Sequence, residues 1–254
     1  MVDFDYILIS CEHGGNHIPA RLRAAFRGAD KVLKTHRGLD IGALELARRL
    51  ARRLPSGPSK APLHFATTSR LVVDLNRSTN SRTLLSHWTR GLGDETRRWI
   101  MAKHYWPYRN DLYADLRRLC ARGRVLHLSI HSFTPRLRGV TRRTDIGVLH
   151  DPEIPSEARV AQHLRRELQV ACPTLKVHMN LPYRGTTDSF VTWARMGLPA
   201  DRYLGFELEV NQKFAERSPR KWPQIMDAMI AGILTYVAKH GPKPDRKPTR
   251  NRKT

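Results

Sequence analysis

Residues 7–19 read Ile7-Leu8-Ile9-Ser10-Cys11-Glu12-His13-Gly14-Gly15-Asn16-His17-Ile18-Pro19. The apolar beginning of this stretch is typical of a buried β-strand, and an acid, an imidazole and two glycines follow where the strand ends. In open α/β folds the carboxyl ends of the strands form the edge that carries the binding site. We therefore predict a strand over residues 4–10 and place His13 at such an edge. There it either binds a metal ion or forms an ordinary hydrogen bond.

The composition is that of a folded protein with a sizeable core. The chain has 254 residues, 40% of them hydrophobic, which suits one large α/β domain or two small ones. No apolar run approaches the roughly 18–20 residues that span a bilayer, and the acidic first residues lack a signal-peptide pattern. Its three cysteines are scattered, which favours neither a disulfide framework nor a thiolate zinc site. We expect a cytoplasmic protein without a membrane partner.

The charge of the chain is unusually positive. Lys and Arg number 45 against 23 acidic residues, which gives a net charge of +22. Such a field attracts polyanions without specificity. Because many arginines occur in pairs on the expected solvent faces of helices, a solvated basic surface is one interpretation. Non-specific nucleic-acid binding is the other.

Alternating strand and helix patterns predict the fold class. Apolar runs predict further strands over residues 63–67, 71–75, 125–130, 144–149, 175–179 and 203–210. Periodicity predicts helices over residues 19–26, 40–54, 96–122, 156–170 and 223–239, with a break at Pro107 and a cap at Ser156. This order predicts an α/β fold in which a mainly parallel or mixed central sheet carries helices on both faces. Residues 1–241 are expected to form one domain, and the basic residues 242–254 a disordered tail.

Polar residues gather at the ends of the predicted strands, and parallel strands would bring them to one crevice. They are Glu12, His13, Ser69, Arg70, Asp74, Asn76, Arg77, His131, Ser132, Asn180, Tyr183, Glu207 and Glu209. Two histidines and a carboxylate suit a catalytic zinc ion with an open position for water. A further carboxylate could take the proton from that water, and Arg77 could hold a substrate carboxylate. No short metal signature such as HExxH is present, so residue types alone leave the ligands open.

Five motifs in order carry a resemblance to a known family. They are Ser10-Cys11-Glu12-His13-Gly14-Gly15-Asn16-His17-Ile18-Pro19, Ser69-Arg70-Leu71-Val72-Val73-Asp74-Leu75-Asn76-Arg77-Ser78, His131-Ser132-Phe133-Thr134-Pro135, Asn180-Leu181-Pro182-Tyr183-Arg184-Gly185 and Glu207-Leu208-Glu209-Val210-Asn211. From about residue 6 to about residue 237, the chain resembles the N-formylglutamate amidohydrolase family. The resemblance implies a hydrolase fold like that of the zinc carboxypeptidases, with Zn²⁺ as the cofactor. It also implies hydrolysis of an amide, with N-formyl-L-glutamate giving formate and glutamate in the namesake enzymes.

The resemblance also implies a set of metal ligands. His13 and His131 match the metal histidines of the family, and Asp40 matches an acidic position that would supply the third ligand. In zinc carboxypeptidases the third ligand is a Glu three residues after the first His. That place is held here by Asn16, a poor ligand for Zn²⁺. Glu12 and His36 are further alternatives, and Asp40 could instead cap the helix that follows it.

The catalytic and substrate-binding residues are carried over in the same way. Glu209 matches the late glutamate of the family and would be the general base. Glu207 stays an alternative because it lies on the same strand face, and either glutamate could instead form an ion pair with an arginine. Asp74-Leu75-Asn76-Arg77 is similar to the substrate-carboxylate motif of zinc carboxypeptidases. This similarity implies that Asn76 and Arg77 bind the substrate, together with Arg70, Asn180 and Tyr183.

His127 and Cys11 are better interpreted as structural residues. His127 lies four strand residues before His131, or roughly 13 Å away, which is too far for both to bind one ion. We expect it to be a hydrogen-bonded histidine of the core or of the surroundings of the site. Cys11 is expected to be a small buried strand residue rather than a nucleophile.

We therefore expect a zinc-dependent amidohydrolase that cleaves an N-formylglutamate-like amino acid or a related small carboxylate amide. A small anionic molecule is the expected partner. Two alternatives stay open: the same chemistry on a cell-wall or peptide amide, and a basic nucleic-acid-associated protein built on a hydrolase scaffold. The sequence indicates neither the acyl group that is cleaved nor the oligomeric state.

Overall fold

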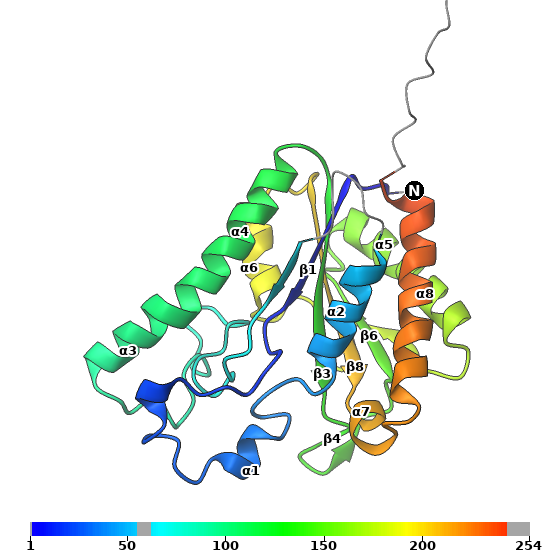
Figure 1. The fold of residues 1–254 in the computed structure, drawn as a ribbon. Helices are drawn as coiled ribbons and strands as arrows, with labels where there is room; N and C mark the ends of the chain where they lie inside the picture. The colour runs from blue at the N-terminus through cyan, green and yellow to red at the C-terminus, as the bar shows by residue number, and fades with distance from the viewer. Residues whose placement is uncertain (1, 55–61, 243–254) are drawn as a thin grey trace, which may run out of the picture.

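A six-stranded mixed sheet in the order β2-β1-β3-β8-β6-β7 forms the centre of the computed structural model, which describes residues 2–54 and 62–242 (Figure 1). The strands are β1 (Tyr6–Cys11), β2 (Leu63–Phe65), β3 (Val125–Phe133), β6 (Ile146–Leu149), β7 (Val177–Met179) and β8 (Tyr203–Asn211). Strands β2, β1, β3 and β8 are parallel, β6 is antiparallel to β8, and β7 is parallel to β6. The short strands β4 (Arg136–Leu137) and β5 (Val140–Thr141) form a separate hairpin.

Helices follow most of the strands. They are α1 (Asp30–Leu33), α2 (Ala43–Arg53), α3 (Asp94–Ile100), α4 (Trp106–Cys120), α5 (Pro155–Ala171), α6 (Phe190–Gly197), α7 (Lys213–Arg217) and α8 (Trp222–His240). A 3₁₀ turn, η1 (Ala20–Leu22), and a π-helical segment, η2 (Met101–Tyr105), complete the set.

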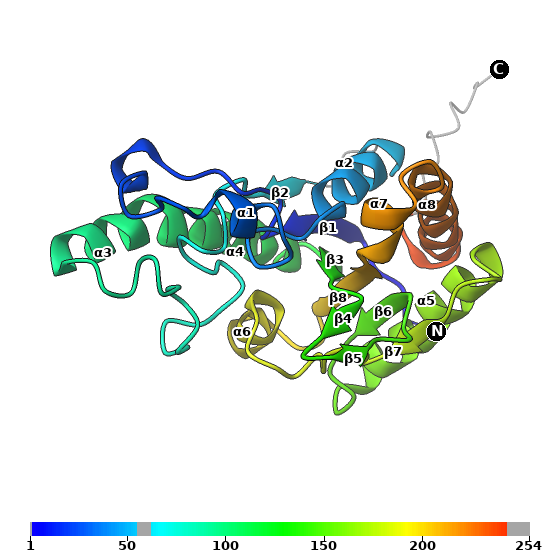
Figure 2. The same ribbon diagram turned by 90° about the horizontal axis from the view of Figure 1, so that it is seen from below.

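The two faces of the sheet carry different helices because side chains alternate along a strand. On one face, Ile9, Leu128 and Phe206 belong to the main hydrophobic core, which includes buried residues of α2, α5 and α8. On the opposite face, Leu8 and Val125 belong to a smaller core with residues of α4 and α6. Figure 2 shows α2 and α8 on one side of β1, β3 and β8, and α6 on the other. The predicted α/β class, with a mixed sheet and helices on both faces, is confirmed.

Helix α2 follows the predicted pattern but begins later than residue 40. Its buried side chains, Ala43, Leu46, Ala47 and Leu50, follow the i, i+3, i+4, i+7 pattern of one helix face, and each leucine among them contributes roughly 1.5–3 kcal/mol by leaving water. Gly42 precedes the helix with a left-handed φ of 84°, and a Cβ at this position would lie 2.9 Å from the Trp222 ring. Asp40 therefore lies before the helix and does not cap it, so its carboxylate can face the sheet.

Three predictions of secondary structure are wrong. Residues 71–75 form turns rather than a strand, because the main-chain carbonyls of Leu71 and Val72 accept hydrogen bonds from the side chains of Ser86 and Thr89. Helix α5 begins at Pro155 with Ile154 before it, so Ser156 is not its cap. Within residues 19–26 the structure contains only the turn η1 and further turns.

The predicted helix over residues 96–122 is continuous, with a change of type in place of a break. Helix α3 passes into the π-helical η2, and α4 follows directly. Pro107 lies in the first turn of α4. The wider π-helical turn before it accommodates a ring that lacks an N–H.

Across residues 2–54 and 62–242, no helix combines the length and the apolar character needed to cross a membrane. Residues 243–254, which make up nearly all of the predicted basic tail, lie outside the described residues.

Candidate metal centre and active site

Polar side chains gather at the carboxyl ends of β1, β3 and β8, on the face of the sheet that carries the smaller core. The parallel register places His131 of β3 directly opposite Glu209 of β8, and Ser129 opposite Glu207. His131, Glu207 and Glu209 line a cavity of about 210 Å³. The strand ends thus bring together residues that lie up to about two hundred positions apart in the chain, as parallel packing predicts.

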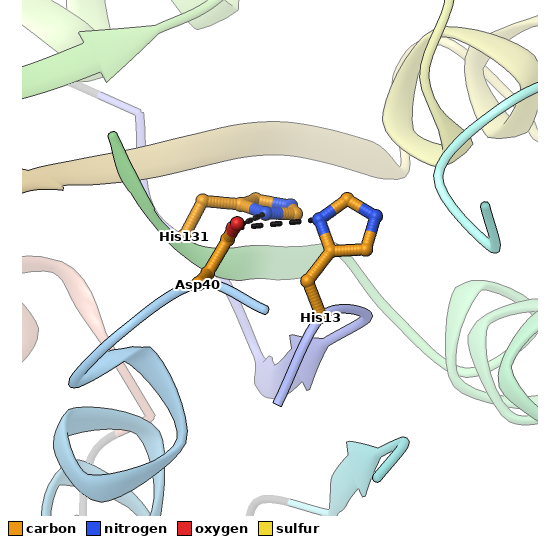
Figure 3. A group of neighbouring side chains, drawn as sticks. All are labelled: His13, Asp40 and His131. Carbon is orange, nitrogen blue, oxygen red and sulfur yellow. Dashed lines mark hydrogen bonds and ion pairs between the residues drawn. The ribbon is translucent and has the colours of Figure 1, made fainter. Parts of the chain in front are cut away.

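Three buried side chains could hold a metal ion at this edge: His13 just after β1, Asp40 before α2 and His131 in β3 (Figure 3). One possible ligand atom from each lies within 4.8 Å of the others. Oδ2 of Asp40 lies 3.4 Å from Nδ1 of His13 and 2.8 Å from Nδ1 of His131. Ligand atoms about 2.0–2.1 Å from a tetrahedral Zn²⁺ lie roughly 3.3–3.4 Å apart, so a small movement of one imidazole would let all three meet one ion.

The other nitrogen of each imidazole faces a fixed oxygen atom. Nε2 of His13 lies 2.7 Å from Oδ1 of Asp74. Nε2 of His131 lies 2.9 Å from Oγ of Ser129 and 3.2 Å from Oε2 of Glu12. Carboxylates in these positions favour a proton on each Nε2 and direct each Nδ1 toward Asp40. The two rings are thus oriented to bind a cation through Nδ1.

The charges around His131 determine its protonation. Burial lowers the pKa of His131, but its hydrogen bonds to Asp40 and Glu12 raise the pKa well above its ordinary value. Burial raises the pKa of Asp40, but both imidazoles and Arg70 together hold it well below its usual range. A protonated imidazole between two carboxylates is the result. A divalent cation would take the place of that proton, so metal affinity should rise with pH.

Asp74→Asn is expected to weaken zinc binding by roughly 10–100-fold, because the neutral amide no longer stabilises the His13 imidazole as a ligand. Competition with a zinc-binding dye measures this change. Asp115→Asn is the matched control, since Oδ2 of Asp115 lies 3.0 Å from Nε2 of His64, in a His–Asp pair outside the cavity. Equal zinc affinity in wild type and Asp74→Asn would contradict the orienting role.

The two glutamates of β8 have different surroundings. Oε1 of Glu207 accepts a hydrogen bond of 2.8 Å from Nδ2 of Asn76. Oε2 of Glu209 is buried and finds no hydrogen-bond partner in the described part of the chain. Burial raises the pKa of Glu209 to about 8, against the attraction of His131. A buried carboxyl without a partner destabilises the fold, which sets Glu209 apart from its neighbour.

The two arginines predicted to bind substrate, Arg70 and Arg77, differ in whether a carboxylate already pairs with them. Arg70 donates to Asp40 at 3.2 Å and to Asp74 at 2.7 Å, so it supports the candidate ligands. Arg77 donates to the main-chain oxygens of Asn76 and Asp188 and, among the described residues, forms no ion pair with a carboxylate. Arg77 is therefore the arginine of the cavity whose charge is available to a substrate anion.

The Asn76 side chain is held from two sides. Its Oδ1 accepts a hydrogen bond of 2.7 Å from the main-chain N–H of Phe190, while its Nδ2 donates to Glu207. The amide thus lines the cavity with little freedom to rotate.

The loop after β7 contributes only one of its two predicted residues. Tyr183 lines the cavity, and its hydroxyl lies 2.9 Å from Nη1 of Arg142. Asn180 does not line this cavity. Its Oδ1 accepts hydrogen bonds from the main-chain N–H groups of His150 and Gly185 and so shapes the loop.

The alternative third ligands lie elsewhere. Nδ2 of the exposed Asn16 donates to the main-chain oxygen of Leu33. His36 lines a neighbouring hollow. Glu12 lies on the Nε2 side of His131, with Oε2 3.2 Å from that nitrogen, and accepts hydrogen bonds from Ser129 and Tyr108. The predicted core role of His127 agrees with its buried contacts to Ser10 and Tyr203.

Sequence reasoning missed Arg109, which donates hydrogen bonds to main-chain oxygens of the loop that contains Asn76 and Arg77. Its side chain is almost fully buried and donates to the main-chain oxygen of Leu75 at 2.9 Å. Its guanidinium carbon lies 4.7–5.1 Å from the ring centroids of Tyr105, Phe190 and Trp193. The only signal would have been an arginine on the apolar side of a predicted helix, a weak one in so basic a chain.

Comparison with solved structures finds a similar fold in a gene product from Agrobacterium tumefaciens, at a TM-score of 0.73 and 25% identity over 92% of this chain and 90% of that one. A metallo-carboxypeptidase from Burkholderia cenocepacia (TM-score 0.44, 14% identity, covering 92% of this chain and 58% of that one) is more distant. An N-acetylmuramoyl-L-alanine amidase of Nostoc punctiforme is also distant (TM-score 0.40, 13% identity, covering 91% and 97%). These last two similarities are too weak to support a conclusion.

Sequence comparison gives a clearer result. No curated protein matches this chain. The profile of the N-formylglutamate amidohydrolase family matches residues 6–215, which include His13, Asp40, Asn76, Arg77, His131 and Glu209. The chain belongs to the N-formylglutamate amidohydrolase family.

Proposed function

We propose that this protein is a zinc-dependent amidohydrolase that cleaves the amide of an N-acyl amino acid of the N-formylglutamate type. Membership of the family supports amidohydrolase chemistry. The donor set supports the metal, because two imidazole nitrogens and one carboxylate oxygen converge from three segments, and their outer contacts keep the nitrogens aimed inward. Three protein ligands with one open position are usual for catalytic zinc.

Each residue has a defined part in the proposed reaction. His13, Asp40 and His131 would hold the ion, which would supply polarisation of the scissile carbonyl and a lowered pKa of a bound water. Glu209 accepts a proton from the attacking water and passes it to the leaving nitrogen. Arg77 holds a carboxylate of the substrate, and Asn76, fixed by Glu207 and Phe190, limits how the amide can lie in the cavity.

The observation that carries this proposal is the buried carboxyl of Glu209, whose Oε2 has no hydrogen-bond partner in residues 2–54 and 62–242. It lies directly across the β3–β8 register from His131, a candidate ligand, in a cavity that also contains Arg77, which forms no ion pair with a carboxylate among the described residues. A carboxyl group with a pKa near neutrality suits proton transfer at the pH of most cells.

Zinc analysis combined with a formate-release assay tests the proposal. We expect about one zinc per chain and hydrolysis of N-formyl-L-glutamate. Activity should be lost on chelation and restored by added Zn²⁺. Inertness of the zinc-loaded protein toward a panel of N-formyl and N-acetyl amino acids would overturn the assigned substrate class. A protein that fails to bind zinc at pH 8 would overturn the metal assignment.

A further inference from the structure

A second hollow adjoins the proposed active site. Its volume is about 400 Å³, against about 210 Å³ for the cavity that contains the candidate ligands. Arg70 and Arg77 line both spaces, so the two share a wall made of these side chains. The two spaces are therefore adjacent, on either side of these two arginines.

The hollow is strongly basic. Its lining contains four arginines, Arg37, Arg70, Arg77 and Arg90, and a single carboxylate, Asp74. That carboxylate is already engaged, because Asp74 accepts hydrogen bonds from Arg70 and faces Nε2 of His13. No acidic group of the lining is left to neutralise the other arginines.

Arg37 and Arg90 reach the hollow from two separate loops, one before α2 and one before α3. Within residues 2–54 and 62–242, both make their hydrogen bonds through main-chain atoms and leave the guanidinium groups without a protein partner. Both residues are exposed and line the same hollow, and guanidinium groups bind carboxylates and phosphates through charge-assisted hydrogen bonds.

Of the two arginines that line the smaller cavity, Arg77 is the one without a carboxylate partner among the described residues. One substrate carboxylate satisfies it. The guanidinium groups of Arg37 and Arg90 in the adjoining hollow are available to a second anionic group on the same molecule. The volume of this hollow exceeds what one amino-acid side chain fills.

Building on the proposed function, we propose that this hollow binds a second anionic group carried on an extension of the amide substrate. The favoured substrates are then N-acyl amino acids that are lengthened by a chain ending in a carboxylate or phosphate-type group, rather than single amino acids.

A net charge of +22 makes basic hollows common, so the test compares variants of equal charge. Arg37→Gln/Arg90→Gln removes the two free guanidinium groups. Arg117→Gln/Arg166→Gln removes two exposed arginines that line neither space and serves as the control. Three substrates of equal length complete the design: N-formyl-γ-glutamylglycinamide, N-formyl-γ-glutamylglycine and N-formyl-γ-glutamylaminomethylphosphonate.

For the zinc-loaded wild type, we expect kcat/KM to be about tenfold higher for a charged extension than for the neutral one, as two charge-assisted hydrogen bonds allow. Comparison of kcat/KM for the glycine and aminomethylphosphonate extensions shows whether the hollow prefers a carboxylate or a phosphate-type group. The Arg37→Gln/Arg90→Gln variant should lose this preference, while hydrolysis of N-formyl-L-glutamate stays within about twofold. An equal loss in the control variant, or no preference in the wild type, would overturn the proposal.

A binding measurement separates this inference from the proposed activity. Calorimetric titration of the zinc-free protein with γ-glutamylglycine and with inorganic pyrophosphate, at about 0.15 M salt, requires no hydrolysis. If no substrate is cleaved but Arg37→Gln/Arg90→Gln alone weakens binding, the hollow is an anion site and the proposed reaction is wrong. If cleavage occurs but binding is the same in all three proteins, the hollow is not a subsite.

Discussion

Glu209→Gln is expected to lower kcat by roughly 10²–10⁴-fold while leaving the zinc content unchanged, because the amide cannot accept the proton of the attacking water. The same change should stabilise the zinc-free protein. Burial raises the pKa of Glu209 to about 8 from an ordinary value of 4.5. Between these two values the unfolded chain ionises the group and the folded chain does not, so stability falls as pH rises.

Glutamine is neutral at every pH and escapes this loss. The gain in melting temperature should therefore grow between pH 5 and pH 8, to roughly 4–8 °C for about 2 kcal/mol. Bound zinc attracts the carboxylate and should reduce the gain. Differential scanning fluorimetry with and without chelator measures both effects.

Glu207→Gln is the matched control for the activity measurement, since its side-chain oxygen can still accept the hydrogen bond from Asn76. We expect a smaller loss of kcat in this variant. If Glu207→Gln is inactive and Glu209→Gln retains activity, the two glutamates have exchanged the roles proposed here.

His131→Ala is expected to abolish both stoichiometric zinc binding and hydrolysis. The substitution removes one of three candidate ligands and leaves the buried Glu12 without its imidazole partner. Burial raises the pKa of Glu12. Hydrogen bonds to His131 and Ser129 and the charge of His131 lower this pKa by more than burial raises it, so the carboxylate is ionised in the folded protein. Breaking such a buried pair costs about 3–5 kcal/mol, and a fall of roughly 6–20 °C in melting temperature should follow.

His127→Gln is the control that distinguishes loss of a metal ligand in His131→Ala from a general loss of stability. His127 is fully buried, lies on the same face of β3 and contacts Ser10 and Tyr203, but it belongs to neither the candidate ligand set nor the cavity. We expect this variant to melt earlier than wild type yet to retain zinc by elemental analysis. Zinc retained by His131→Ala would contradict the proposed metal centre.

Most of the sheet could be predicted because its strands are local apolar runs with clear ends. The antiparallel direction of β6 could not, because the short connection through β4 and β5 leaves no periodic signal of strand direction. Residues 71–75 are as apolar as a strand. Their main-chain carbonyls, however, are taken by Ser86 and Thr89, far along the chain, and local pattern cannot show this.

The candidate site shows the same limit. The resemblance named His13, Asp40 and His131, and residue types alone suggested two histidines and a carboxylate. The position of Asp74 behind His13, and the choice between a bonded Glu207 and an unpartnered Glu209, depend on contacts between distant segments. Only the assembled fold specifies them.

Strand β8 is the last strand in chain order, yet it lies between β3 and β6 in the middle of the sheet. A chain that stops before Tyr203 would therefore leave the edges of β3 and β6 with open hydrogen-bonding groups, a state prone to self-association. During synthesis on the ribosome, all three candidate ligands emerge well before the strand that carries Glu209. A nascent chain would thus hold the proposed metal ligands before it had the glutamate proposed to act as the base.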